Sequence, residues 1–104
     1  MLRERLEINR RELAAVLAMG ERTLIRREDS GSALDTVEAD RVYRVARIFK
    51  LATEMIGDEA KARRWIRGRI PALGGKTPLE LLISEAGARQ VESVLYSIGY
   101  GGVA

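Results

Sequence analysis

The chain has no cysteine and no histidine among its 104 residues. These absences exclude disulfides, thiol nucleophiles, zinc sites built from Cys and His, and acid–base catalysis by imidazole. An enzyme would have to rely on Asp, Glu, Lys, Tyr, Ser or Thr. We therefore expect a protein that is not an enzyme, with no catalytic residues, no cofactor and no metal site.

Long apolar runs are also missing. No segment approaches the roughly 20 residues that cross a bilayer. The first seven residues mix acids with bases and contain no apolar stretch typical of a signal peptide. We expect a cytoplasmic protein without a membrane partner.

Basic charge is concentrated in the first two thirds of the chain. Residues 1–69 hold 16 Lys and Arg against 12 Asp and Glu, whereas residues 70–104 hold 2 against 3. A basic excess suits an anionic polymer such as DNA, although ordinary proteins often carry a similar balance.

The hydrophobic pattern predicts an all-α fold, because no segment alternates apolar and polar residues for long enough to form a strand. About six helices are expected, over residues 10–18, 22–29, 36–56, 59–67, 79–83 and 85–98. Their start signals are Asn9, Asp35, Asp58 and Ser84 as N-caps and Pro78 at a first helical position. The long central helix should end at Gly57. Inward faces are predicted at Val42, Val45, Ala46, Phe49, Ala52, Ile56, Ala62, Trp65, Ile66, Ala88, Val91, Val94, Leu95 and Ile98.

The segment from Glu12 to Arg27 has the layout of a helix-turn-helix. The turn is placed at Met19–Glu21, where Gly20 is free to adopt a positive φ. The second helix would then face DNA with Glu21, Arg22, Thr23, Arg26 and Arg27. A helical hairpin that does not touch DNA, with solvated arginines, is the alternative.

Two further patterns have more than one interpretation. Arg41, Arg44 and Arg47 on the long helix form either a second ridge that touches phosphates or a solvated face. Gly74-Gly75-Lys76-Thr77 has the wrong spacing for a phosphate-binding loop, because Ile70 stands where its first Gly is needed. We expect a plain turn there, followed by a helix that Pro78 starts.

The C-terminal part presents several motifs in a fixed order. They are Trp65, Leu73-Gly74-Gly75, Thr77-Pro78, Leu81-Leu82, Gly87-Ala88, Val91, Leu95 and Gly101. This order resembles the C-terminal domain of Xre/MbcA/ParS-type antitoxins, and the upstream segment resembles the Xre/Cro helix-turn-helix. The latter likeness is imperfect: Ala18 stands where that family commonly has Gly, and Gly20 where it has Ser or Thr. Only about eight residues precede Asn9, so the first helix of that fold is expected to be truncated.

The resemblance implies two regions, a DNA-binding region at 1–34 and a helical toxin-binding domain at 35–104. Such antitoxins pair with RES-domain toxins, which consume NAD by degrading it or by transferring ADP-ribose to a protein. The antitoxin docks on the toxin, blocks the NAD-binding cleft and represses its own operon by binding operator DNA. A homodimer and a hetero-oligomer with the toxin are expected.

The same resemblance places toxin contacts near the end of the chain. They are expected at Arg89, Tyr96, Tyr100, Gly101, Gly102, Val103 and Ala104. A frayed terminus without function is the alternative interpretation of this tail. A stand-alone transcription regulator, whose C-terminal helices only dimerise, is the alternative for the whole chain.

Overall fold

The computed structural model describes residues 6–31 and 35–101. These residues form α2 (Arg10–Val16), α3 (Glu21–Ser30), α4 (Thr36–Ile56), α5 (Glu59–Arg67), the short 3₁₀ helix η1 (Pro71–Leu73), α6 (Pro78–Leu81) and α7 (Glu85–Gly99). No strand occurs in the described part of the chain, so the all-α prediction is confirmed.

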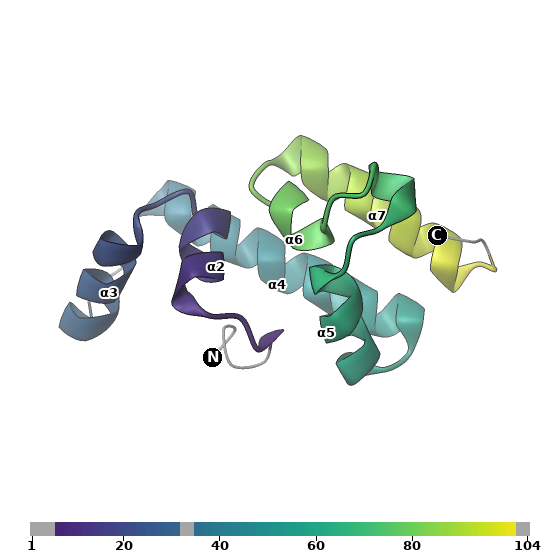
Figure 1. Ribbon diagram of the computed structural model, residues 1–104, viewed down its shortest axis with the longest axis horizontal. Helices are drawn as coiled ribbons and strands as arrows, with labels where there is room; N and C mark the ends of the chain where they lie inside the picture. Colours follow the sequence, from purple (N-terminus) through teal and green to yellow (C-terminus); the bar gives the residue numbers. More distant parts are fainter. Residues whose placement is uncertain (1–5, 32–34, 102–104) are drawn as a thin grey trace.

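Helix α4 is the longest helix described and packs against both α5 and α7 (Figure 1). The hairpin of α2 and α3 lies toward one end of α4, while α5 and α7 pack along its remaining length (Figure 1). The described chain is elongated, with extents of 45 × 24 × 21 Å.

The helix boundaries follow the local capping signals. Asp35 starts α4 with a capping box completed by Glu38, and Gly57 ends it with φ of 88°. Asp58 and Ser84 accept hydrogen bonds from backbone amides of α5 and α7, as expected. Helix α2 is shorter than predicted, because it ends at Val16 and not at Ala18.

The main hydrophobic core lies where α4, α5 and α7 meet. Its fully enclosed members on these helices include Val45, Ile48, Ala52, Ala62, Ile66, Ala88, Val91 and Leu95. Most of the predicted inward positions are therefore confirmed. Ala46 is an exception because it is exposed. Five other predicted inward residues are only partly buried and pack against the edge of a core: Val42, Ile56, Trp65, Val94 and Ile98.

A second, much smaller apolar cluster holds the α2–α3 hairpin. It consists of Ala14, Leu17 and Leu24, with Leu13, Met19 and Val42 packed against it. Burial of so few apolar side chains stabilises the hairpin far less than the main core stabilises the rest. Polar contacts must therefore contribute to fixing the position of α3.

Candidate functional site

The α2–α3 hairpin begins with a complete capping box. The Glu12 amide donates to Asn9 Oδ1 at 2.8 Å, and the Asn9 amide donates to Glu12 Oε1 at 3.0 Å. This reciprocal pair satisfies two amides that the helix leaves without intrahelical partners.

A Schellman motif closes the end of α2. The Met19 amide donates to the Ala14 carbonyl at 3.0 Å, and the Ala18 amide donates to the Ala15 carbonyl at 3.1 Å. Ala18 takes the left-handed position of this motif, with φ of 54°, which glycine adopts at lower cost.

Gly20, where a positive φ was permitted, does not adopt one. Gly20 is the N-cap of α3 and is extended, with φ of −70°. The chain reverses its direction before Gly20, because α2 ends at Val16. Leu17 is the C-cap of α2, and Ala18 is the next residue. Gly20 makes no capping hydrogen bond with a side chain, which Ser or Thr at this position could make.

The predicted DNA-facing residues fall into two groups. Arg22 and Arg26 are exposed one helical turn apart on α3, and within residues 6–31 and 35–101 neither forms an ion pair. Glu21 is also exposed, and Thr23 is half-buried. Arg27 differs, because its Nη1 lies 2.7 Å from Oε1 of Glu38, a buried residue of α4.

The three arginines of α4 are bound within the chain, so neither the phosphate ridge nor the solvated face is correct. Arg41 Nη1 donates to the Leu17 carbonyl at 2.8 Å. Arg44 Nη1 donates in the same way to the Leu82 carbonyl at 3.1 Å. Leu17 and Leu82 are the C-caps of α2 and α6, whose carbonyls lack helical partners and carry the negative end of the helix dipole.

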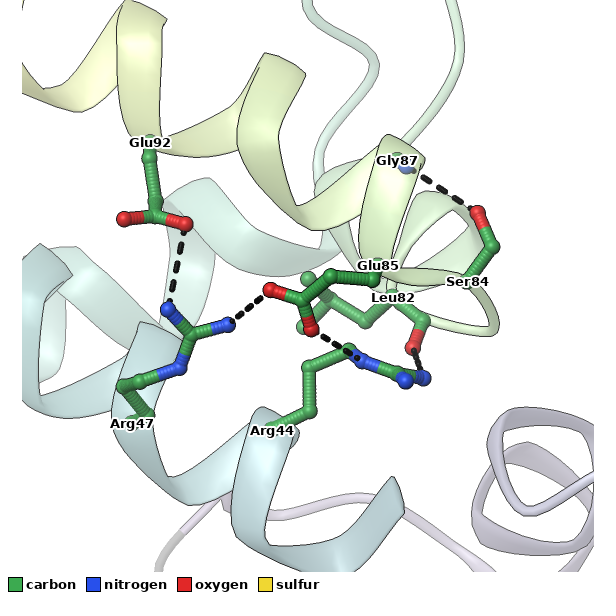
Figure 2. Close-up of polar contacts among 7 residues, drawn as sticks. All are labelled: Arg44, Arg47, Leu82, Ser84, Glu85, Gly87 and Glu92. Atoms are coloured by element: carbon green, nitrogen blue, oxygen red, sulfur yellow. Dashed lines mark hydrogen bonds and ion pairs between the residues drawn. The ribbon is translucent and has the colours of Figure 1, made fainter. Parts of the chain in front are cut away.

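Arg47 completes a network that joins α4 to α7 (Figure 2). Its guanidinium contacts Glu85 at 2.7 Å and Glu92 at 3.2 Å, while Arg44 Nε contacts the other oxygen of Glu85 at 3.2 Å. The hydrogen bond from Arg44 is the main cause that holds the pKa of Glu85 below its ordinary value, with Arg47 adding to it. Sequence reasoning missed this network, because the partners are about 40 residues apart in the chain.

The corner between α6 and α7 depends on a very close backbone approach. A Cβ at Gly87 would lie 1.9 Å from the Leu81 carbonyl oxygen, so only glycine fits. Pro78 occupies the first turn of α6 after the Thr77 capping box, and Gly74 and Gly75 both have positive φ. The predicted turn and helix start at this segment are confirmed.

The predicted toxin contacts that the structure describes lie on one face of α7 and just beyond it. Arg89, Tyr96, Tyr100 and Gly101 are all exposed. The rings of Tyr96 and Tyr100 are stacked, with centroids 6.0 Å apart and planes inclined by 4°. Tyr100 is the C-cap residue of α7. Gly102, Val103 and Ala104 lie outside the described residues.

A groove runs along the α4–α7 side next to these residues. Residues from both helices line it: Tyr43, Ala46, Arg47, Lys50, Leu51, Glu54, Glu92 and Tyr96. Tyr43 and Tyr100 are two of the most exposed large hydrophobic side chains described, at 67% and 79%. Tyr43 was not predicted, and a large exposed aromatic on an otherwise polar helix face is the signal that would have found it.

The described residues contain neither a membrane-spanning helix nor a cluster of metal ligands. No helix there is both long and apolar enough to cross a membrane. No group of three or more Asp and Glu side chains in the described ranges is arranged to hold a metal ion.

Comparisons with known proteins identify the C-terminal half. Residues 51–101 match the family described as the antitoxin Xre/MbcA/ParS C-terminal toxin-binding domain. A protein named antitoxin Xre from Pseudomonas putida is 37% identical over 82 residues, which cover 77% of this chain and 52% of that protein. One of the same name from Yersinia enterocolitica is 28% identical over 95 residues, covering 90% of this chain and 64% of that protein. The chain therefore spans about half to two thirds of the length of these relatives.

Proposed function

This chain belongs to the Xre/MbcA/ParS antitoxin family, and on that premise we propose that it neutralises a RES-domain toxin and represses its own operon. The match of residues 51–101 to a toxin-binding domain carries the proposal. The family description names a binding domain and not a catalytic one, which agrees with the prediction that the protein is not an enzyme.

The face of α7 that carries Arg89, Tyr96 and Tyr100 is the proposed toxin contact. These positions recur at helical spacing on the side of α7 opposite the buried Ala88, Val91 and Leu95. A stacked, exposed pair of tyrosines has the large area and rigid shape that protein interfaces favour at their centres. In the complex this end of α7, with the residues that follow it, blocks the NAD-binding cleft of the toxin.

Operator binding is proposed for α3, with Arg22 and Arg26 as the base-reading side chains. Their guanidiniums are exposed at i and i+4, and Thr23 lies between them. Arginine can donate two parallel hydrogen bonds to guanine, and this contact distinguishes guanine from the other bases. A contact with phosphate does not provide that discrimination. A dimer would place two such helices on a symmetric operator.

Co-expression with a RES-domain toxin encoded beside this gene tests the toxin proposal. The intact chain should restore growth and co-purify with the toxin, whereas the double variant Tyr96→Ala, Tyr100→Ala should lose both properties. Val37→Ser is the matched control, because Val37 is also exposed, at 56%, but lies in the first turn of α4. Failure of the intact chain to co-purify would favour the stand-alone regulator.

A further inference from the structure

One side of α4 forms a seat for the hairpin that carries the proposed DNA-reading helix. The seat consists of Glu38, Arg41 and Val42. Glu38 contacts α3 through Arg27, Arg41 donates to the turn at Leu17, and Val42 packs on the small apolar cluster. Glu38 and Arg41 are three residues apart, so both point from the same face of α4.

We infer that Arg27 does not contact DNA, and that its ion pair with Glu38 is a positioning device that sets the angle at which α3 enters the groove. This inference rests on the proposed binding of operator DNA by α3. It assigns Glu38, which no DNA-binding pattern would select, a role in the specificity of binding.

The burial and geometry of the pair support this assignment. The Arg27 side chain is 30% exposed and that of Glu38 only 10%, whereas Arg22 and Arg26 are on the open face. Glu38 Oε1 also accepts a hydrogen bond from the Asp35 amide at 3.0 Å. The first turn of α4 therefore holds the carboxylate in place independently of Arg27. Moving Arg27 to a phosphate would leave a buried carboxylate without its cation, which is costly.

The apolar support of α3 is small, and a second ion pair of this helix, Arg10 Nε with Glu28 Oε1 at 3.3 Å, joins it to α2 of the same hairpin and not to α4. Leu24 is the only buried residue of α3 within the described part of the chain. One side chain cannot fix the rotation of a helix about its own axis. An ion pair to a separate, rigid helix supplies the missing constraint.

Glu38→Gln distinguishes a positioning role of Glu38 from simple charge repulsion between Glu38 and DNA. The two explanations predict opposite changes in the affinity for DNA. Glutamine keeps an oxygen for the Asp35 amide but loses the charge that holds Arg27. Removing an acidic group near DNA strengthens binding by general attraction. If Glu38 positions α3, the affinity for a selected sequence should instead fall about tenfold, as expected when a charge-assisted hydrogen bond is lost. Affinity for an unrelated duplex should stay the same or rise.

Arg27→Met gives an independent readout through the salt dependence of binding. A residue that contacts a phosphate contributes about 0.9 to the slope of log K against log salt concentration. We expect Arg27→Met to lower affinity for the selected sequence while leaving this slope unchanged. Arg26→Met, at an exposed position on the same helix, is the comparison for a residue proposed to read bases, and it should reduce the preference for the selected sequence over an unrelated duplex.

The experiment uses the full chain, a duplex enriched by that chain from a random-sequence pool, and an unrelated duplex of equal length. The double variant Arg27→Met, Glu38→Gln should bind no worse than either single variant, because the two side chains act as one unit. Circular dichroism and melting temperature establish that each variant is folded. Additive losses, a reduced slope for Arg27→Met, or stronger binding of both duplexes by Glu38→Gln would overturn the inference. Absence of any enrichment by the intact chain would instead refute DNA binding itself.

Discussion

Replacing Gly87 with alanine should destabilise the protein strongly, although alanine is the better helix former. The added Cβ would lie 1.9 Å from the Leu81 carbonyl oxygen and 2.8 Å from the carbonyl carbon. An ordinary van der Waals contact begins at 3.4 Å, and even the shortest tolerated distance of 3.0 Å requires the α6–α7 corner to open by about 1 Å. Because the obstructing atoms belong to the backbone, no change of rotamer can relieve the clash.

The magnitude follows from two opposing effects. Overpacking typically costs about 1–3 kcal/mol, and the cost is higher where the backbone must move. Alanine has a higher helix propensity than glycine, which offsets about 1 kcal/mol of this cost. A net loss of about 2–3 kcal/mol is expected, which lowers the melting temperature of a chain of this size by about 10 °C or more.

Thermal denaturation followed by circular dichroism measures this loss. Gly99→Ala, at the last residue of the same helix, is the matched control. Its Cβ would meet only the side chain of Met55, with the sulfur at 2.2 Å, and that flexible side chain can move aside. We expect a small change there. A melting temperature of Gly87→Ala equal to or above that of the unmodified chain would refute the close packing of α6 on α7.

Four other substitutions or deletions test separate parts of the structure. Ala18→Gly should stabilise the hairpin by about 1 kcal/mol, because Ala18 is exposed and has φ of 54°, and an unchanged urea midpoint would contradict this. Glu85→Gln should lower stability at neutral pH. The difference in stability between this variant and the unmodified chain should vanish as the pH falls below 4.5, because a carboxyl with a lowered pKa loses its stabilising contribution when it is protonated. A difference in stability that persists at low pH would argue against the Arg44 and Arg47 contacts. Trp65→Ala should cost about 2 kcal/mol, less than the 3–5 kcal/mol of a fully buried tryptophan, since the ring is partly exposed; complete loss of helical signal at 25 °C would show that the ring is more central. Deleting Tyr100–Ala104 should leave the helical signal and DNA binding intact but abolish rescue from a RES-domain toxin, and full rescue would assign the block to the helical body.

Local signals in the sequence were sufficient to predict most helix boundaries. Asp35, Gly57 and Pro78 each act within one helical turn, so the residues that determine the boundary are adjacent to it. The core positions of α7 were equally clear, because Ala88, Val91 and Leu95 repeat with the helical period.

The arginines of α4 could not be assigned in the same way. Their spacing places Arg41, Arg44 and Arg47 on the outer part of a helix, but it contains no information about which distant groups approach them. Arg44 meets a carbonyl 38 residues away, and Arg47 meets a carboxylate at the same separation. The turn after α2 is a related case, since Gly20 is permitted but not required to adopt a positive φ, and Ala18 has the positive φ there.

Helix α4 also sets the distance between the two proposed binding regions. It is 21 residues long, and at about 1.5 Å per residue it spans about 30 Å without a break. Its first turns seat the hairpin, and its later turns lie in the core with α5 and α7. A toxin held on α7 would therefore stand at a fixed distance and angle from DNA held on α3. Cutting the chain at residue 51, where the family match begins, would remove Val45, Ile48 and Phe49 from that core. A toxin-binding fragment that folds by itself should therefore begin no later than Asp35.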